Sequence, residues 1–144
     1  MNGQKDAAAL VGRILLAALF VTSGFSKLTG FAGTAGYIAS QGVPLPQVAA
    51  AIAVLIELGG GLAILAGWMT RWVALATVVF LIVITPIFHG YWSGTEEERM
   101  TNEIMFWKNV SMLGGFLLLF AFGPGRYSID EKMAGGSSSH RSFA

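Results

Sequence analysis

The residues of this chain that could do chemistry are a few ionisable side chains inside long apolar stretches. Glu57 stands alone in AVLIELGGGLAIL (53–65), where every other residue is apolar or glycine. Lys27, His89 and Lys108 stand in three other apolar stretches. A histidine and a lysine could hydrogen-bond a carbonyl oxygen of a ligand, and a nearby carboxylate could relay a proton.

The composition indicates that these groups belong to a membrane protein. The chain has 144 residues, of which 54% are hydrophobic and 12% are charged, about half the usual charged share. A soluble domain of this size has too much surface for its volume to bury so much apolar area. The net charge of +1 gives no general attraction to nucleic acid, so we expect the lipid bilayer, and no nucleic acid, as a partner.

Four segments are long and apolar enough to cross a bilayer as helices, which takes about 20 residues each. They run from about Ala7 to Leu28, Val48 to Met69, Arg71 to Trp92 and Ile104 to Phe122. We therefore predict an all-α, integral membrane, antiparallel four-helix bundle over residues 1–131. Residues 132–144 are predicted to form a flexible polar tail.

The connections between the predicted spans differ in character. Residues 30–47 are rich in Gly and Pro, and FAGTAGYIASQ within them could form a short helix at the membrane interface, anchored by Phe31, Tyr37 and Ile38. Residues 93–103 are predicted to be an acidic loop. The link between the second and third spans is reduced to Thr70 and Arg71, so those helices should be adjacent.

Basic residues near the ends of the spans predict which side of the membrane each loop and terminus faces. Lys5, Arg71, Arg126, Lys132 and Arg141 fall on one side, and Lys27, Arg99 and Lys108 on the other. This bias favours both termini in the cytoplasm.

The depth of each ionisable residue predicts a shared polar pocket in the outer half of the bundle. At about 1.5 Å per residue, Glu57 lies about 13 Å below the outer end of its span, and His89 and Lys108 lie about 5 and 6 Å below theirs. Lys27 lies about 2 Å from the outer end of the first span, whereas Arg13 lies about 9 Å from the inner end. The pocket candidates are Glu57, His89, Lys108, Lys27, Arg13 and Asn109.

Each candidate also has a structural interpretation. Glu57 could simply be paired with Lys108, Lys27 or Arg13 to hold the helices together, because an unpaired charge in the bilayer costs about 3 kcal/mol or more. His89 could be an ordinary interfacial histidine. We expect Lys27 to extend toward the head groups, and Lys108, with Asn109 beside it, to face the interior.

Small residues predict where helices approach closely. Gly59, Ala63 and Gly67 recur every fourth residue, a pattern that allows tight helix packing. Gly60 and Gly61 stand near Glu57 and could serve packing alone or ligand approach. The residues expected at helix contacts are Gly24, Gly59, Gly60, Gly61, Ala63, Gly67 and Gly115.

The sequence lacks the residues that disulfides, metal or haem sites and common catalytic motifs require. The chain has no cysteine, which excludes disulfides and thiolate metal sites within it. His89 is the one histidine in a predicted span, so neither haem nor metal binding is expected. No nucleotide-binding or nucleophile-elbow motif occurs, so the sequence contains no self-contained catalytic motif and leaves open whether the protein is an enzyme.

Taken in order, the motifs resemble the DoxX family. They are RILLAALFVTSGFSKL (13–28), ELGGGLAILAGWMTRWVAL (57–75), His89, FWKNVSMLGGFLLL (106–119) and GPGRYSID (123–130). The resemblance spans about residues 8–131, and its matching positions are Arg13, Gly24, Lys27, Glu57, Gly60, Gly61, His89 and Lys108. It implies a small four-helix protein of the bacterial inner membrane. Some members are subunits of a thiosulfate:quinone oxidoreductase and others are linked to oxidative or thiol-stress defence.

Three functions are compatible with these features. The first is a redox-associated subunit that binds a quinone or another small molecule in the polar pocket and receives electrons from an oxidoreductase partner. The second is a non-enzymatic scaffold that recruits soluble stress-defence proteins. The third is a small transporter, which could be a homo-oligomer through the face of Gly59, Ala63 and Gly67.

Overall fold

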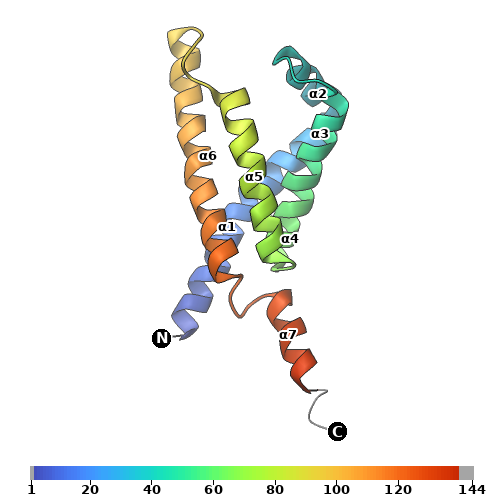
Figure 1. Ribbon diagram of the computed structural model, residues 1–144, viewed down its shortest axis with the longest axis vertical. Coiled ribbons are helices and arrows are strands. Elements are labelled where there is room, and N and C mark those ends of the chain that lie inside the picture. The colour runs from blue at the N-terminus through green and yellow to red at the C-terminus, as the bar shows by residue number, and fades with distance from the viewer. Residues whose placement is uncertain (1, 140–144) are drawn as a thin grey trace.

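The structure is a computed structural model that describes residues 2–139, with side chains described for residues 3–135. Within that range it is helical and contains no strand. Four of its helical segments are long and apolar enough to cross a membrane: Gly3–Thr29, Pro46–Ala66, Thr70–His89 and Glu96–Phe122. The predicted all-α membrane bundle is therefore confirmed (Figure 1).

The first span is the long helix α1 (Asn2–Thr29), and a short helix α2 (Phe31–Ser40) follows it at once. The short helix predicted in this region is present. Ile38, however, is buried and packs with Ala35 and Ala50, so it is a core residue of this corner instead of a lipid anchor. Tyr37 is half exposed and its ring lies 5.8 Å from that of Phe88.

The second span consists of α3 (Pro46–Val54), a π-helical turn η1 (Leu55–Gly60) and α4 (Gly61–Ala66). It ends before the predicted Met69, because Gly67 adopts a left-handed conformation with φ of 69°. Glycine is the residue that usually ends a helix in this way, since it lacks a Cβ. The link to the next helix is therefore 67–69, and the predicted link of Thr70 and Arg71 is wrong.

The third and fourth spans are α5 (Thr70–His89) and α6 (Glu96–Phe122). Most of the predicted acidic loop 93–103 is in fact the first part of α6. Thr95 caps this helix: its Oγ1 accepts a hydrogen bond from Glu98 N, and its own N donates to Glu98 Oε2 at 2.9 Å. This capping box, together with acidic residues in the first turn, stabilises a helix start that hydropathy does not reveal.

The core of the bundle joins α1, α4, α5 and α6. Its centre is the edge-to-face contact of Phe20 with Phe116, whose ring centroids lie 5.1 Å apart. The other core residues are Ala17, Ile64, Ala74, Val78, Leu81 and Leu119. Figure 1 shows α5 and α6 side by side, while α2 and α3 form a second arm that leans away from them.

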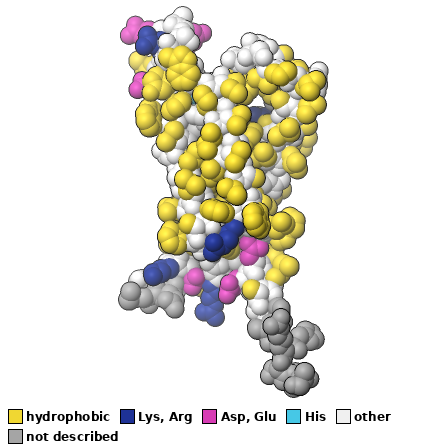
Figure 2. Space-filling model, viewed as in Figure 1, with side chains coloured by type: hydrophobic (Ala, Val, Ile, Leu, Met, Phe, Trp, Pro, Cys, Tyr) yellow, Lys and Arg dark blue, Asp and Glu magenta, His cyan; other side chains and the backbone are white. Residues whose placement is uncertain are grey.

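The outer surface matches a lipid environment. Figure 2 shows hydrophobic side chains over the middle of one face and charged side chains gathered near its two ends. Large apolar residues that are more than two thirds exposed include Leu15, Leu55 and Trp72. Such exposure is unfavourable in water and favourable in a bilayer, so these side chains fit contact with lipid.

The segment that follows α6 contacts the N-terminal end of α5. Asp130 accepts hydrogen bonds from Met69 N and Thr70 N, at 2.7 and 2.9 Å, and thereby caps α5. Helix α7 (Ile129–Ser139) then leads away from the bundle (Figure 1). The predicted tail 132–144 is thus helical as far as Ser139, and its last residues, 140–144, lie outside the described part of the chain.

Candidate functional site

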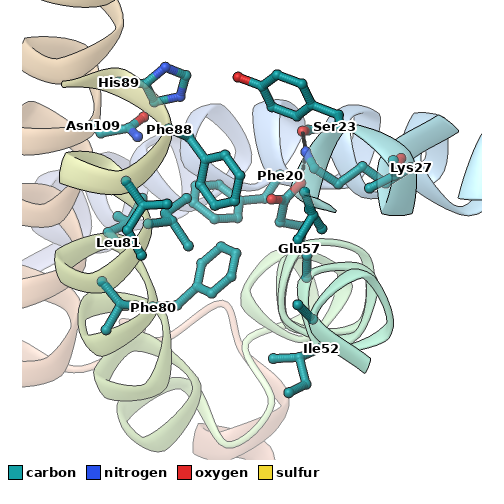
Figure 3. A pocket seen from close by; sticks show the side chains of 18 of the residues that line it. Phe20, Ser23, Lys27, Ile52, Glu57, Phe80, Leu81, Phe88, His89 and Asn109 are labelled. Atoms are coloured by element: carbon teal, nitrogen blue, oxygen red, sulfur yellow. Dashed lines mark hydrogen bonds and ion pairs between the residues drawn. The ribbon is translucent and has the colours of Figure 1, made fainter. Parts of the chain in front are cut away.

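A cavity of about 400 Å³ lies between α1, α2, α3, η1, α5 and α6. Most of its lining is apolar, and Figure 3 shows Phe20, Phe80 and Phe88 among the side chains around it. Figure 2 also shows a basic side chain inside the hollow between the two arms. Five of the predicted pocket candidates line this cavity: Glu57, His89, Lys108, Lys27 and Asn109.

Glu57 and Lys27 form an ion pair on one wall. Lys27 Nζ lies 2.8 Å from Glu57 Oε2 and also donates to Ser23 Oγ at 2.7 Å. The Glu57 side chain is 7% exposed and that of Lys27 is 32% exposed. Of the three partners left open for Glu57, the structure selects Lys27. The expectation that Lys27 extends toward the head groups is therefore wrong, because the buried carboxylate draws its ammonium group inward.

The π-helical turn aims Glu57 at this wall. A π turn accommodates more residues than an α turn and shifts which positions face inward; such turns are rare and frequently lie at functional sites. Glu57 and Gly61 are both buried, whereas Gly59 is exposed. The predicted stripe of Gly59, Ala63 and Gly67 is thus wrong. Gly59 is exposed within the π turn, whereas Ala63 is buried in α4 and Gly67 is buried just beyond the end of that helix, so the three do not form one helical stripe.

Two glycines let α1 touch the second span. A Cβ added at Gly24 would lie 2.4 Å from Leu58 N, and one at Gly61 would lie 3.1 Å from Val21 N. The backbones of α1 and η1 are therefore in direct contact next to the ion pair. This contact fixes Lys27, one turn beyond Gly24, opposite Glu57.

Two further glycines behave as packing residues. A Cβ at Gly60 would lie 3.4 Å from Val73 Cγ1, and one at Gly115 would lie 3.2 Å from Leu16 Cδ1. Both contacts are to side chains, so they are looser than the approach of the two backbones at Gly24.

The opposite wall carries His89 at the end of α5, and Lys108 and Asn109 on α6. Asn109 is 4% exposed, and its Nδ2 donates to Thr85 Oγ1 at 3.1 Å. Lys108 Nζ donates to Met105 Sδ at 3.2 Å. Figure 3 shows His89 and Asn109 on one side, Lys27 and Glu57 on the other, and the ring of Phe88 between them.

Arg13 does not belong to this site. It is 1% exposed and donates through Nη2 to the carbonyl oxygen of Tyr127, in the segment that follows α6. A Cβ at Gly67 would lie 2.0 Å from Arg13 Nη1, so the end of α4 packs directly against the guanidinium group. Its place among the pocket candidates is therefore wrong: it holds the chain after α6 against the base of the bundle.

The sequence-based prediction missed several residues of the cavity. Ser23 could have been found, because it precedes Lys27 by four residues on one helix face. Tyr37 and Thr34 from α2 also line the cavity. No pattern in the sequence placed them there, because the position of α2 beside the cavity is set by its packing against α3.

The arrangement can bind a molecule that is largely apolar and carries polar atoms at two places. Pockets of this kind, apolar with a few placed polar groups, are typical of small-molecule sites. Among the described residues, no three histidine, aspartate or glutamate side chains lie close enough together to hold a metal ion.

Comparison with known proteins identifies the family. The sequence profile of DoxX matches residues 8–90. The inner membrane protein YqjF of Escherichia coli is 45% identical over 134 residues, which cover 91% of this chain and 95% of that protein. The inner membrane protein YphA of the same organism is 42% identical over 85% of this chain and 88% of its own length.

A more distant similarity reaches a eukaryotic protein. The Surfeit locus protein 4 homolog of Schizosaccharomyces pombe is 26% identical over 85% of this chain, which corresponds to 36% of that longer protein. No solved structure matches the chain. The family profile and the two bacterial relatives show the family, and the structure contains four candidate membrane spans. The chain is therefore an integral membrane protein that belongs to the DoxX family.

Proposed function

We propose that this protein binds a quinone, or a small molecule of similar shape and polarity, as a redox-associated subunit of the bacterial inner membrane. The observation that carries the proposal is the cavity of about 400 Å³, which is apolar along its middle and polar at two walls. A quinone has matching features, since it has a flat ring and two carbonyl oxygens on opposite sides.

The cavity residues fit these features. Phe20 and Phe88 offer aromatic surface against which a ring can pack. The ammonium group of Lys27 can donate a hydrogen bond to one oxygen, and His89 or Lys108 on the opposite wall can donate to the other. Glu57, beside Lys27, is placed to accept or supply a proton.

The redox part of the proposal requires a second protein. The chain contains no cysteine and so lacks a dithiol that could deliver electrons. We therefore propose that electrons come from an oxidoreductase partner and that the role of this chain is to bind and orient the quinone. Its inner-membrane location is inferred from the two bacterial relatives, both named as inner membrane proteins.

Quinone binding should be measurable on purified protein. We expect a short-chain benzoquinone or naphthoquinone to raise the midpoint temperature of unfolding in a neutral detergent, because a ligand that binds the folded state stabilises it. His89→Leu should weaken the shift, because it removes one of the hydrogen-bond donors on the wall opposite Lys27. Chromatography of a solvent extract of the purified protein would show whether a quinone is retained from the membrane.

Trp72→Leu is the matched control, because Trp72 lies on the outer surface and outside the cavity. It should leave the quinone-dependent shift unchanged. If neither quinone class changes the unfolding temperature and none is retained, the proposed function is wrong.

The orientation can be tested cleanly because the chain has no cysteine. We propose, from the distribution of basic residues, that both termini are cytoplasmic and that the cavity lies in the outer half of the bilayer. A Ser93→Cys variant should then react with a membrane-impermeant maleimide in intact cells. Lys132→Cys should react only after the cells are opened, and the reverse pattern would overturn the orientation.

A further inference from the structure

The charges that line the cavity do not balance. Two lysines and one carboxylate contribute to the lining, together with His89. Glu57 and Lys27 neutralise each other across 2.8 Å. Lys108, on the opposite wall, is left as the unbalanced cation of the site.

Lys108 has a weak partner for a lysine inside a predicted span. Its Nζ donates to the thioether sulfur of Met105 at 3.2 Å, and sulfur is a poor acceptor. Among the described residues, Lys27–Glu57 is the ion pair that forms, and no carboxylate lies within ion-pair distance of Lys108. A charge in a membrane helix is expensive unless it is paired, and an unpaired one marks a functional site by default.

The neighbouring polar side chain does not compensate the charge. Asn109 is neutral and its amide group is already bonded to Thr85 Oγ1 at 3.1 Å. The ammonium group of Lys108 is therefore the strongest donor that this wall can offer to a ligand.

We propose that the ligand carries an acidic oxygen, and that Lys108 binds it as an anion. The inference rests on the proposed function, since it assigns the chemistry of a quinone-like ligand in the same cavity. It predicts that a quinone with an ionised hydroxyl group binds better than a neutral one. The acidic oxygen then faces α6, and the opposite carbonyl oxygen faces Lys27 and Ser23.

A matched pair of probes tests the assignment. 2-Hydroxy-1,4-naphthoquinone is an anion at neutral pH, because its hydroxyl group is conjugated to a carbonyl group as in a carboxylic acid. Its methyl ether is neutral and nearly the same in shape. In neutral detergent, we expect the anion to bind the wild-type protein about tenfold more tightly than the ether, because hydrogen bonds to ionised groups are roughly twice as strong as neutral ones. Lys108→Met should abolish this preference, so that the anion and the ether bind the variant with similar affinity.

Two variants control for other effects. Lys108→Arg keeps the charge and should retain the preference for the anion. Lys132→Met makes the same chemical change on α7, outside the cavity, and should bind both probes like the wild type. Thermal unfolding of each variant without ligand shows whether it is folded, and binding of the ether reports an intact cavity even if the anion no longer binds.

The outcomes separate the two proposals. If neither probe binds the wild-type protein, the quinone-binding function itself is wrong. If both bind with equal affinity and Lys108→Met changes neither, the cavity binds quinones but Lys108 does not hold an anion. A lysine that merely extends toward lipid head groups would give this second result.

Discussion

Gly24→Ala is expected to destabilise the bundle by about 2–3 kcal/mol, the upper part of the range typical of overpacking a tight contact. The new Cβ would lie 2.4 Å from Leu58 N and 2.8 Å from Leu58 Cα. These are backbone atoms of η1, which cannot rotate aside as a side chain can, so α1 and the second span would have to separate. The midpoint of unfolding by sodium dodecyl sulfate, followed by circular dichroism, measures the loss.

Gly12→Ala is the matched control in the same helix. A Cβ at Gly12 meets nothing within 4 Å, and alanine favours a helix over glycine by about 1 kcal/mol in water. This variant should be as stable as the wild type or slightly more so. Equal stability of the two alanine variants would show that the close approach at Gly24 does not exist.

The same substitution should also disturb the cavity. Gly24 and Lys27 are on one face of α1, and Leu58 follows Glu57 directly. Separating the two backbones therefore pulls Lys27 away from Glu57. If the cavity binds quinones as proposed, Gly24→Ala should weaken that binding, whereas Gly12→Ala should leave it intact.

Lys27→Met is expected to destabilise the protein by about 3 kcal/mol, and more than Glu57→Gln does. The first change leaves a carboxylate that is 7% exposed without its ionic partner. The second leaves a lysine whose side chain is less buried, at 32% exposed, and which still donates to Ser23 Oγ. The substitution that leaves the more buried partner unpaired, Lys27→Met, should therefore cause the larger loss of stability.

A double-mutant cycle tests this asymmetry. The variant with both Lys27→Met and Glu57→Gln removes both charges together, so it should recover much of the stability that Lys27→Met loses. Thermal unfolding in detergent of the four proteins gives the coupling energy. If the effects of the two single substitutions are additive, the ion pair makes no net contribution and the explanation fails.

Much of the fold follows from patterns that act along the chain. Four apolar stretches are each long enough to cross a bilayer as a helix. They must be helical, because backbone polar groups in lipid need hydrogen-bond partners within their own helix. Ionisable residues are so rare in those stretches that their positions alone single out Glu57, His89, Lys27 and Lys108. The same criterion also selects Arg13, which lies outside the cavity. The other four residues also fall at one end of the bundle, because depths along antiparallel helices of known rise can be compared.

The predicted element bounds are wrong where local hydrogen bonding overrides hydropathy. The capping box of Thr95 and Glu98 begins α6 within residues predicted to be a loop. Gly67 ends α4 earlier than the apolar pattern does, because it takes a left-handed conformation. Both signals are present in the sequence, as a Thr three residues before a Glu and as a glycine at a helix end. A hydropathy pattern does not detect either of them.

The sequence by itself determined the membrane-spanning helices, their charged residues and the end of the bundle at which most of those charges gather. Only the tertiary structure decided that Glu57 pairs with Lys27 and that Arg13 holds the chain near Tyr127, 114 positions away. These choices depend on the rotation of each helix about its own axis, and the π turn at Leu55–Gly60 changes that rotation within one span. Helix rotation is set by packing against neighbours, such as Gly24 against Leu58, and such long-range contacts leave no periodic signal along the chain.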